Sequence, residues 1–318
     1  MEPRGLELIA RYKQVFRMAP EIEISEEMIL EHWELEKNLT KELLKSNSEN
    51  RWEVFEQAYT TLYSKIEWLK WQNSLPQDVK QTQPGEKYKA WLQVIGSPPQ
   101  KIYEVGSGKA EIISYFAKCG FECKATEITR ERGSKHITDP LQNLSWGNSD
   151  GVHLDNFEPT EFYDLVISSQ VIEHFHPDDL IIHLKSAHKI LKNEGKYIFS
   201  TPHRHTGPHD ISSVFGCDKP QGMHLKEYTY RELKNYLIMF GYKLIYSAGP
   251  AKFAKQLSKI GIDKEQQIIK IGVFYLNLML IVENIIFAIP SQKIRRSFSK
   301  SLRKIYLFSD NIFLVAQK

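Results

Sequence analysis

Short apolar runs and amphipathic stretches alternate along the middle of the chain. The apolar runs predict buried strands at residues 101–105, 122–129, 163–170, 195–202 and 242–249. Between them, apolar residues recur with helical spacing at 110–119, 177–191 and 229–241. Thr229 and Glu232 form a capping box at the start of the last helix. With a closing strand at 311–318, this alternation predicts a doubly wound, mainly parallel α/β sheet.

Two amphipathic helices are expected before the first strand, at residues 26–45 and 49–71. Ser25 is the expected N-cap of the first helix. The second repeats apolar residues at Trp52, Phe55, Tyr59, Leu62, Ile66 and Leu69. Residues 72–86 are polar, contain two prolines and predict a linker. The helical pair either covers a binding site or packs on the sheet.

The composition is that of an ordinary globular protein, with 42% apolar and 25% charged residues among 318. The first residues carry acids within their apolar stretch, so they do not resemble a secretory signal. Three cysteines form no C-x-x-C pair, which suits a reducing compartment. We therefore expect a cytoplasmic protein. The net charge of +3 divides unevenly, because residues 252–318 carry +8 and the rest −5.

A glycine-rich turn follows the first strand of the sheet, in the sequence KIYEVGSGKA at residues 101–110. Gly106 and Gly108 allow the backbone to approach a ligand closely. Position 111 is Glu rather than the glycine of a dinucleotide fingerprint, and an acid there would face a pyrophosphate. NAD is therefore disfavoured. Glu104, at the end of the strand, suits a cationic ligand.

This turn resembles the first motif, E-x-G-x-G-x-G, of class I S-adenosylmethionine-dependent methyltransferases, with Ala110 in place of the last glycine. The resemblance covers residues 100–249 and the last eight residues. It implies a Rossmann-like sheet of seven strands, with the last strand antiparallel, and S-adenosylmethionine as the cofactor. The expected organisation is an N-terminal helical extension and linker (1–86), the core (87–251), a helical insert (252–310) and the last core strand (311–318).

The resemblance also assigns residues to the cofactor. Glu104 would reach its charged groups, and Gly106 and Gly108 would let the backbone approach it. Glu127, about 20 residues beyond the turn, would accept hydrogen bonds from both ribose hydroxyls. The segment after residue 144 is similar to the adenine-binding segment of the family, where Asn148 replaces the usual aspartate and Asp150 is the alternative acceptor. The cofactor-binding set is completed by Ser149 and by Gln170, at the end of the central strand.

A hydroxyl acceptor needs a base, and a histidine of near-neutral pKa is the natural one. The VIEH step at 171–174 and the HLKEYT segment at 224–229 resemble the ubiquinone O-methyltransferase type and small methyltransferases of glycan and natural-product clusters. His174 is the leading catalytic candidate, together with Glu173; the alternative is that His174 only shapes the pocket. The candidates for substrate contact are His203, His205, His209 and His224.

A metal site is a further alternative, because Glu173, His174 and His176 with His203 or His209 offer nitrogen and oxygen ligands. In the metal-using relatives the pattern is E-x-x-E-H, and here Gln170 occupies its first position. Since an amide is a poor substitute for a charged ligand, we expect no metal.

The insert combines an apolar segment at 271–290 with a basic amphipathic helix at 293–305. Glu283 and Asn284 interrupt the apolar segment, which argues against a simple transmembrane helix. The pair suits an anionic membrane surface, or else a lid or a homodimer surface. Nucleic acid is disfavoured as a partner because the rest of the chain is acidic.

Together these features predict an enzyme that methylates a hydroxyl of a small-molecule, glycan or lipid-linked acceptor. The alternatives are an RNA 2′-O-methyltransferase and a non-catalytic S-adenosylmethionine-binding protein.

Overall fold

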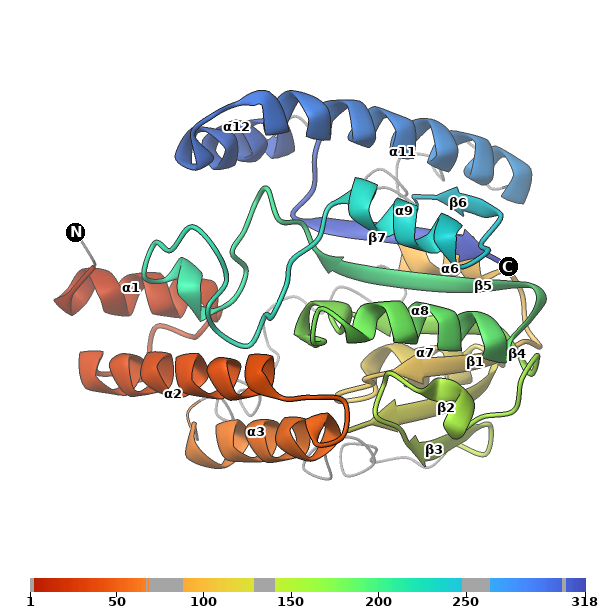
Figure 1. Ribbon diagram of the computed structural model, residues 1–318, viewed down its shortest axis with the longest axis horizontal. Coiled ribbons are helices and arrows are strands. Elements are labelled where there is room, and N and C mark those ends of the chain that lie inside the picture. Colours follow the sequence, from red (N-terminus) through yellow and green to blue (C-terminus); the bar gives the residue numbers. More distant parts are fainter. Residues whose placement is uncertain (1–2, 67, 69–87, 129–140, 248–263, 305–306) are drawn as a thin grey trace.

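The computed structural model describes residues 3–66, 68, 88–128, 141–247, 264–304 and 307–318 (Figure 1). Within these residues one sheet runs in the strand order β3-β2-β1-β4-β5-β7-β6. Its strands are β1 (Lys101–Val105), β2 (Glu122–Glu127), β3 (Leu144–Asn148), β4 (Tyr163–Ser169), β5 (Leu191–Pro202), β6 (Leu244–Tyr246) and β7 (Asn311–Gln317). β7 lies between β5 and β6 and is antiparallel to both, whereas β1 to β5 pair in parallel. The predicted doubly wound, seven-stranded fold is confirmed.

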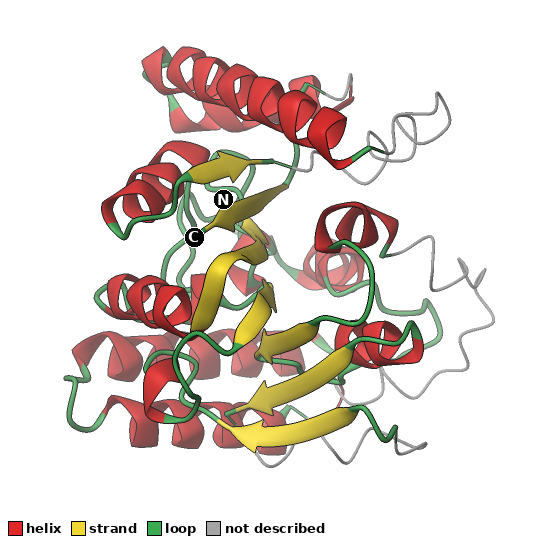
Figure 2. Cartoon of the chain, turned by 90° about the vertical axis from the view of Figure 1, so that its right-hand side faces the viewer, coloured by secondary structure: helices red, strands yellow, loops and turns green. Residues whose placement is uncertain are grey.

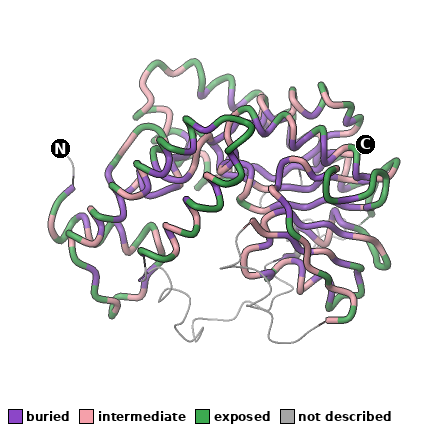
Figure 3. The backbone as a smooth tube through the Cα atoms, turned by 60° about the horizontal axis from the view of Figure 1, so that its bottom comes forward, coloured by how far each residue is buried: buried purple, intermediate pink, exposed green. Residues whose placement is uncertain are grey.

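Helices cover both faces of this sheet (Figures 1 and 2). α8 (Asp179–Ile190), α9 (Tyr230–Met239) and α11 (Glu265–Ala288) share one apolar core with the sheet. α6 (Lys89–Ile95) and α7 (Glu111–Lys118) share a second core on the other face. Side chains that alternate along β4 enter these two layers in turn: Val166 belongs to the first core and Ile167 to the second. Most strand residues are buried as a result (Figure 3).

The N-terminal residues form three helices rather than the two that were predicted: α1 (Gly5–Val15), α2 (Glu26–Lys45) and α3 (Arg51–Lys65). The Ser25 side chain accepts the N–H of Met28 and caps α2, as expected. These helices have an apolar core of their own, which they share with residues after β5, where Trp33 stacks on Phe215 at a centroid distance of 4.7 Å. The N-terminal extension is therefore docked on the core.

Several predicted boundaries shift. β5 begins at Leu191, four residues earlier than expected, because α8 ends at Ile190 and the chain enters the sheet directly. β6 is confined to Leu244–Tyr246. The capping box of Thr229 and Glu232 is present at α9. The predicted linker at 72–86 and the first part of the insert lie outside the described residues. The rest of the insert forms α11 and α12 (Gln292–Lys304).

Candidate active site

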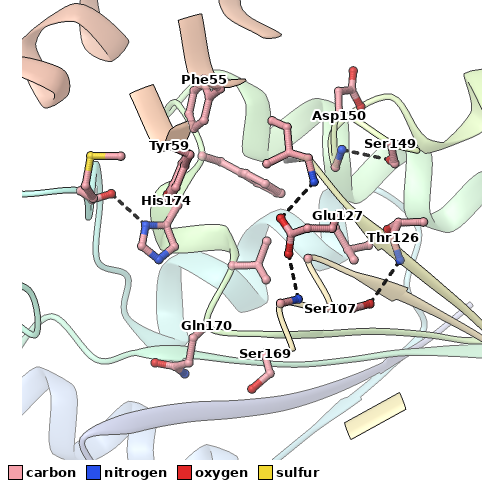
Figure 4. Close-up of a pocket in the computed structure, with 18 of the residues that line it drawn as sticks. Phe55, Tyr59, Ser107, Thr126, Glu127, Ser149, Asp150, Ser169, Gln170 and His174 are labelled. Carbon is pink, nitrogen blue, oxygen red and sulfur yellow. Dashed lines mark hydrogen bonds between the residues drawn. The ribbon is translucent and has the colours of Figure 1, made fainter. Parts of the chain in front are cut away.

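A cavity of about 1120 Å³ lies at the carboxyl ends of β1, β2 and β4. α3 covers it from one side, where Phe55 and Tyr59 face inward (Figure 4). Residues 209–211 with Met223 and His224 line another side. In parallel sheets this edge gathers the loops that bind ligands. The helical extension thus forms a wall of the cavity rather than only packing on the sheet.

The glycine turn forms the floor of the cavity. Gly106 has φ +65°, and a Cβ there would lie 2.8 Å from Cγ2 of Val171. Gly108 has φ +54° and no atom within 4 Å of its Cβ position, so its backbone faces open space. Ala110, which replaces the third glycine of the motif, also adopts a left-handed conformation with φ 58°. The backbone therefore keeps the shape that the motif requires.

Glu104 lies at the bottom of this turn and is almost fully buried. Its Oε2 atom has no hydrogen-bond partner among the described residues. Burial raises the pKa of Glu104 to about 8, and the nearby charge of Glu127 contributes to the increase. A buried carboxyl with an unused oxygen fits a cationic ligand, which would compensate its negative charge.

Glu127 ends β2 beside the turn. Its Oε2 accepts the N–H of Gly108 at 2.8 Å, and its Oε1 accepts the N–H of Ile128 at 3.0 Å (Figure 4). Each carboxylate oxygen has two lone pairs, so both can accept a further hydrogen bond from a ribose hydroxyl. The fixed carboxylate faces the cavity, as the ribose role requires.

The residues predicted to bind the adenine follow each other at the end of β3, but they do not all face the cavity. Asn148 is exposed and does not line the cavity, whereas Ser149 and Asp150 do. Asp150 Oδ1 accepts the N–H groups of Val152 and His153, which shapes the loop. Of the two residues considered for the adenine, Asp150 lines the cavity and Asn148 does not.

Gln170 follows β4 with φ 57°, a strained conformation for a residue other than glycine. Its side-chain Nε2 donates to Ser200 Oγ at 3.3 Å. Gln170 lines the cavity next to Val171, in the region expected for the cofactor.

His174 stands at the end of a short 3-10 helix after β4 and faces α3. Its Nδ1 lies 2.9 Å from the carbonyl oxygen of Met223. Because a carbonyl only accepts, Nδ1 carries the hydrogen and Nε2 is the basic nitrogen. The Tyr59 ring of α3 packs edge-on against His174 with centroids 6.0 Å apart, and Phe55 lies beside it (Figure 4). An aromatic wall therefore faces the candidate base.

A cluster of charged groups lies beside His174, where Glu173 Oε1 is 4.0 Å from its Nε2 and the ring of His224 packs edge-on against it. Glu173 is fully buried and does not line the cavity, which corrects the expectation that it would act on the substrate directly. Burial raises its pKa to about 7. Burial alone would lower the pKa of His224, but its hydrogen bond to Glu227 and the charges of Glu173 and Asp210 outweigh this and raise it to about 9. His224 is therefore the cation of this cluster at neutral pH.

The cluster also contains the only metal-binding geometry found among the described residues. Glu173, His174 and His224 each offer one ligand atom, and these atoms lie within 4.8 Å of one another. The proton on His224 competes for this place, since a ligand nitrogen must be deprotonated. His176, considered as a further ligand in the sequence, instead pairs with Asp178 at 3.5 Å.

Of the four histidines predicted to contact the substrate, two line the cavity and two lie outside it. His209 and His224 line the cavity. His203 is fully buried outside it, where its Nε2 donates to Glu283 of α11 at 2.7 Å. His205 is half-buried and donates its backbone N–H to His203 Nδ1. Both predictions are wrong because β5 and its loop direct these side chains toward α11 and away from the cavity.

Other residues of the site were missed in the sequence. Arg51, at the start of α3, forms a buried ion pair with Asp179 at the start of α8 across the cavity rim. The repeat of aromatic residues along α3 was a visible signal, but it indicated only a helix. Its contact with His174 depends on how α3 docks.

Residues 43–247 match the sequence family described as "Methyltransferase domain", which is more than half of the chain. The chain belongs to this family of methyltransferases. It is an S-adenosylmethionine-dependent enzyme, and S-adenosylmethionine is its cofactor. The buried carboxyl of Glu104 and the fixed carboxylate of Glu127 are the features of the site that suit this cofactor.

Solved structures with a similar fold include a SAM-dependent methyltransferase from Archaeoglobus fulgidus, with 16% identity, a TM-score of 0.46, and coverage of 73% of this chain and 91% of that one. A methyltransferase from Mesorhizobium loti has 15% identity and a TM-score of 0.44, and the match covers 76% of this chain and 99% of that one. Phosphoethanolamine N-methyltransferase 2 from Haemonchus contortus, bound to S-adenosylmethionine, has 13% identity and a TM-score of 0.42. The match covers 70% of this chain and 49% of that one. At these identities the likeness concerns the fold alone. No curated protein sequence matches the chain.

Proposed function

We propose that this methyltransferase methylates a hydroxyl oxygen of a small-molecule, glycan or lipid-linked acceptor, with His174 as the general base. The observation that carries the proposal is the hydrogen bond from His174 Nδ1 to the Met223 carbonyl, which leaves Nε2, 4.0 Å from Glu173 Oε1, as the proton acceptor of the ring. An alcohol or phenol loses its proton when it is methylated, whereas a thioether or tertiary amine has none to lose. A positioned base is therefore most useful for an oxygen acceptor.

The bound cofactor supplies an electrophilic methyl group. Glu104, Gly106, Gly108 and Glu127 would hold it on the floor of the cavity. Phe55 and Tyr59 would orient the acceptor against His174, since orientation contributes more to such a displacement than proton transfer does. Their rings support an acceptor that carries an apolar ring or chain beside its hydroxyl.

An RNA acceptor is less well supported. Within the described part of the cavity, eight Asp and Glu residues line the wall, against two Lys or Arg residues, Arg51 and Lys109. A polyanion would be repelled from such a site.

The test uses the purified protein with S-adenosylmethionine carrying a ¹³C-methyl group and, as acceptors, organic and aqueous extracts of cells that lack the gene. We expect NMR to find the label bonded to oxygen. His174→Ala should slow transfer by about 10²–10⁴-fold, while His188→Ala, outside the cavity, should not. A label on nitrogen, or an unaffected His174→Ala variant, would overturn the proposal. Cofactor binding without transfer to any extract would support the non-catalytic alternative.

A further inference from the structure

α11 is anchored to the core along its inner face. Among the described residues it is the one helix long and apolar enough to cross a membrane by length and composition. However, Gly272 lies so close to the sheet that its carbonyl accepts the N–H of Ser247 at 3.2 Å. Glu283, buried on the same face, accepts the N–H groups of Tyr230 and Arg231 at the start of α9. These contacts fix which face of α11 points outward.

The outward face of α11 carries an apolar stripe. Phe274, Ile281 and Ile285 are 71%, 57% and 53% exposed, and their spacing of seven and four residues places them on one side of the helix. α11 and α12 lie along one margin of the molecule, away from α3 (Figures 1 and 2). No described residue covers the stripe. Surface apolar residues in such a row mark a binding surface more often than scattered ones do.

α12 adds apolar residues and a row of cations next to them. Ile294 and Phe298 are exposed by 58% and 37%, one helical turn apart. Lys293, Lys300 and Lys304 are exposed and recur at intervals of seven and four residues, so they share one side of the helix. None of these lysines pairs with an acid in the part of the chain that the structure describes.

Within the described residues 264–304 and 307–318, each acid pairs with a residue other than these lysines. Glu265 pairs with Lys196 at 2.6 Å, Glu283 with His203, and Asp310 with Arg303. The outer surface of α11 and α12 is therefore apolar and positively charged.

We propose that this surface, formed by the apolar stripe of α11 with Ile294, Phe298 and the three lysines of α12, docks on an anionic lipid bilayer. Apolar side chains would enter the headgroup boundary while the lysines contact lipid phosphates. A second copy of the chain would bring the same positive charge to the contact, so the charge favours lipid over self-association. The inference does not depend on the identity of the acceptor.

The proposed docking helix α12 is also connected to the segment that lines the cavity. Arg296 of α12 donates to the carbonyl oxygen of Cys217 at 2.9 Å, and Gln292 to that of Asp218 at 2.5 Å. The segment that contains these two residues begins with His209 and Asp210, which line the cavity. A bilayer bound by α12 would thus be linked to a wall of the acceptor site through residues 209–218.

The test is sedimentation of the full-length protein with phosphatidylcholine vesicles that contain phosphatidylglycerol, compared with phosphatidylcholine alone. We expect binding only to the anionic vesicles and weaker binding as salt increases. The triple variant Lys293→Gln, Lys300→Gln, Lys304→Gln should lower the partition coefficient by about 10²-fold, at about fivefold per lysine. Its matched control is Lys41→Gln, Lys45→Gln, Lys118→Gln, which removes three exposed lysines elsewhere and should bind as the wild type does.

The apolar stripe is tested separately by Ile281→Asn with Ile285→Asn, and its control is Leu6→Asn at an 85% exposed position of α1. The stripe variant should also lose vesicle binding, with an unchanged circular dichroism spectrum. Equal binding to neutral vesicles, or a lysine variant that behaves like its control, would overturn the proposal. So would light scattering that shows a dimer which only the stripe variant dissociates, because the occupant would then be a second copy.

Discussion

The side chain of Glu36 accepts the backbone N–H of Met223 at 3.1 Å, although the two residues are 187 positions apart in the chain. The carbonyl of Met223 in turn accepts the ring Nδ1–H of His174, so Glu36 holds the residue that orients the candidate base. The other oxygen of Glu36 lies 2.8 Å from Nε2 of the buried His32. Through this contact, α2 is linked to the reaction site.

Glu36→Ala should therefore reduce activity as well as stability. Leaving the N–H of Met223 and the ring of His32 without an acceptor costs about 1–3 kcal/mol of unfolding free energy per group. We expect kcat to fall by about 10-fold or more because His174 loses its fixed orientation, with the calorimetric affinity for S-adenosylmethionine unchanged.

Two further variants separate positioning from general destabilisation. Glu36→Gln keeps an oxygen that can accept from Met223 and should recover most of kcat. Glu34→Ala, at an exposed pair with Lys37 on the same helix, should leave kcat unaltered. If Glu36→Gln were as slow as Glu36→Ala at a temperature where both are folded, the positioning role would be rejected.

Glu127→Ala should weaken cofactor binding. It removes the proposed acceptor for the ribose hydroxyls and releases the N–H of Gly108, which shapes the turn. Hydrogen bonds to a charged acceptor contribute about 1.5–3 kcal/mol each, so calorimetry should show a decrease of at least 10-fold in affinity. Glu122→Ala, at the exposed opposite end of β2, is the control. An unchanged affinity in Glu127→Ala would remove this residue from the cofactor site.

Cofactor binding should depend on pH through Glu104. Its pKa in the free protein is about 8, so at neutral pH it is mainly protonated. A cationic ligand favours the ionised form, which lowers the pKa in the complex and makes binding release a proton below pH 8. Affinity should thus rise with pH toward 8. Calorimetry in buffers of different ionisation enthalpy measures this release.

The ligand has an α-amino group that titrates near the same pH, at about 7.7–8.0. Glu104→Gln separates the two effects, because only the contribution of the protein disappears in the variant. Proton release of the same size in Glu104→Gln would show that the carboxyl does not ionise on binding.

Arg51→Ala should be strongly destabilising. Removing one member of a buried ion pair leaves Asp179 uncompensated, at a cost of about 3–5 kcal/mol in unfolding free energy. Arg11→Ala breaks an exposed pair with Glu7 and should cost less than about 1 kcal/mol. Denaturant unfolding compares the two. Equal effects would mean that the Arg51–Asp179 pair adds no more stability than a surface contact.

Chelation of divalent metals should leave methyl transfer unchanged. His224, whose pKa is raised to about 9, already supplies positive charge beside Glu173. The measurement compares kcat before and after dialysis against EDTA, with metal content checked by mass spectrometry. A loss of activity that Mg²⁺ restores would contradict this expectation and would indicate a metal held by Glu173, His174 and His224.

Local sequence signals predicted most of the framework. The Ser25 and Thr229 caps fix where α2 and α9 begin, because the capping side chain and its backbone partner are three residues apart. The glycine turn was likewise predicted from a few consecutive residues. By contrast, α1 was not predicted, because its buried positions, Leu8 and Tyr12, are few and lie among polar residues.

The candidate site was harder to predict because its contacts join distant segments. His203 and His209 are only six positions apart in the sequence, yet His203 pairs with Glu283, 80 residues later, and His209 lines the cavity. The spacing of Tyr59 along α3 indicates a helix face but not what that face meets. Such contacts follow from how the helices dock, and periodicity carries no information about docking.

The position of β7 has a consequence for synthesis of the protein. β7 fills the space between β5 and β6, so the full ladder of β5 must wait until more than a hundred further residues have been made. At about 5–20 residues per second, one edge of β5 stays unpaired for several seconds on the ribosome. An unpaired edge is open to pairing with other chains. Nascent chains of this methyltransferase therefore pass through an interval in which they depend on protection from aggregation.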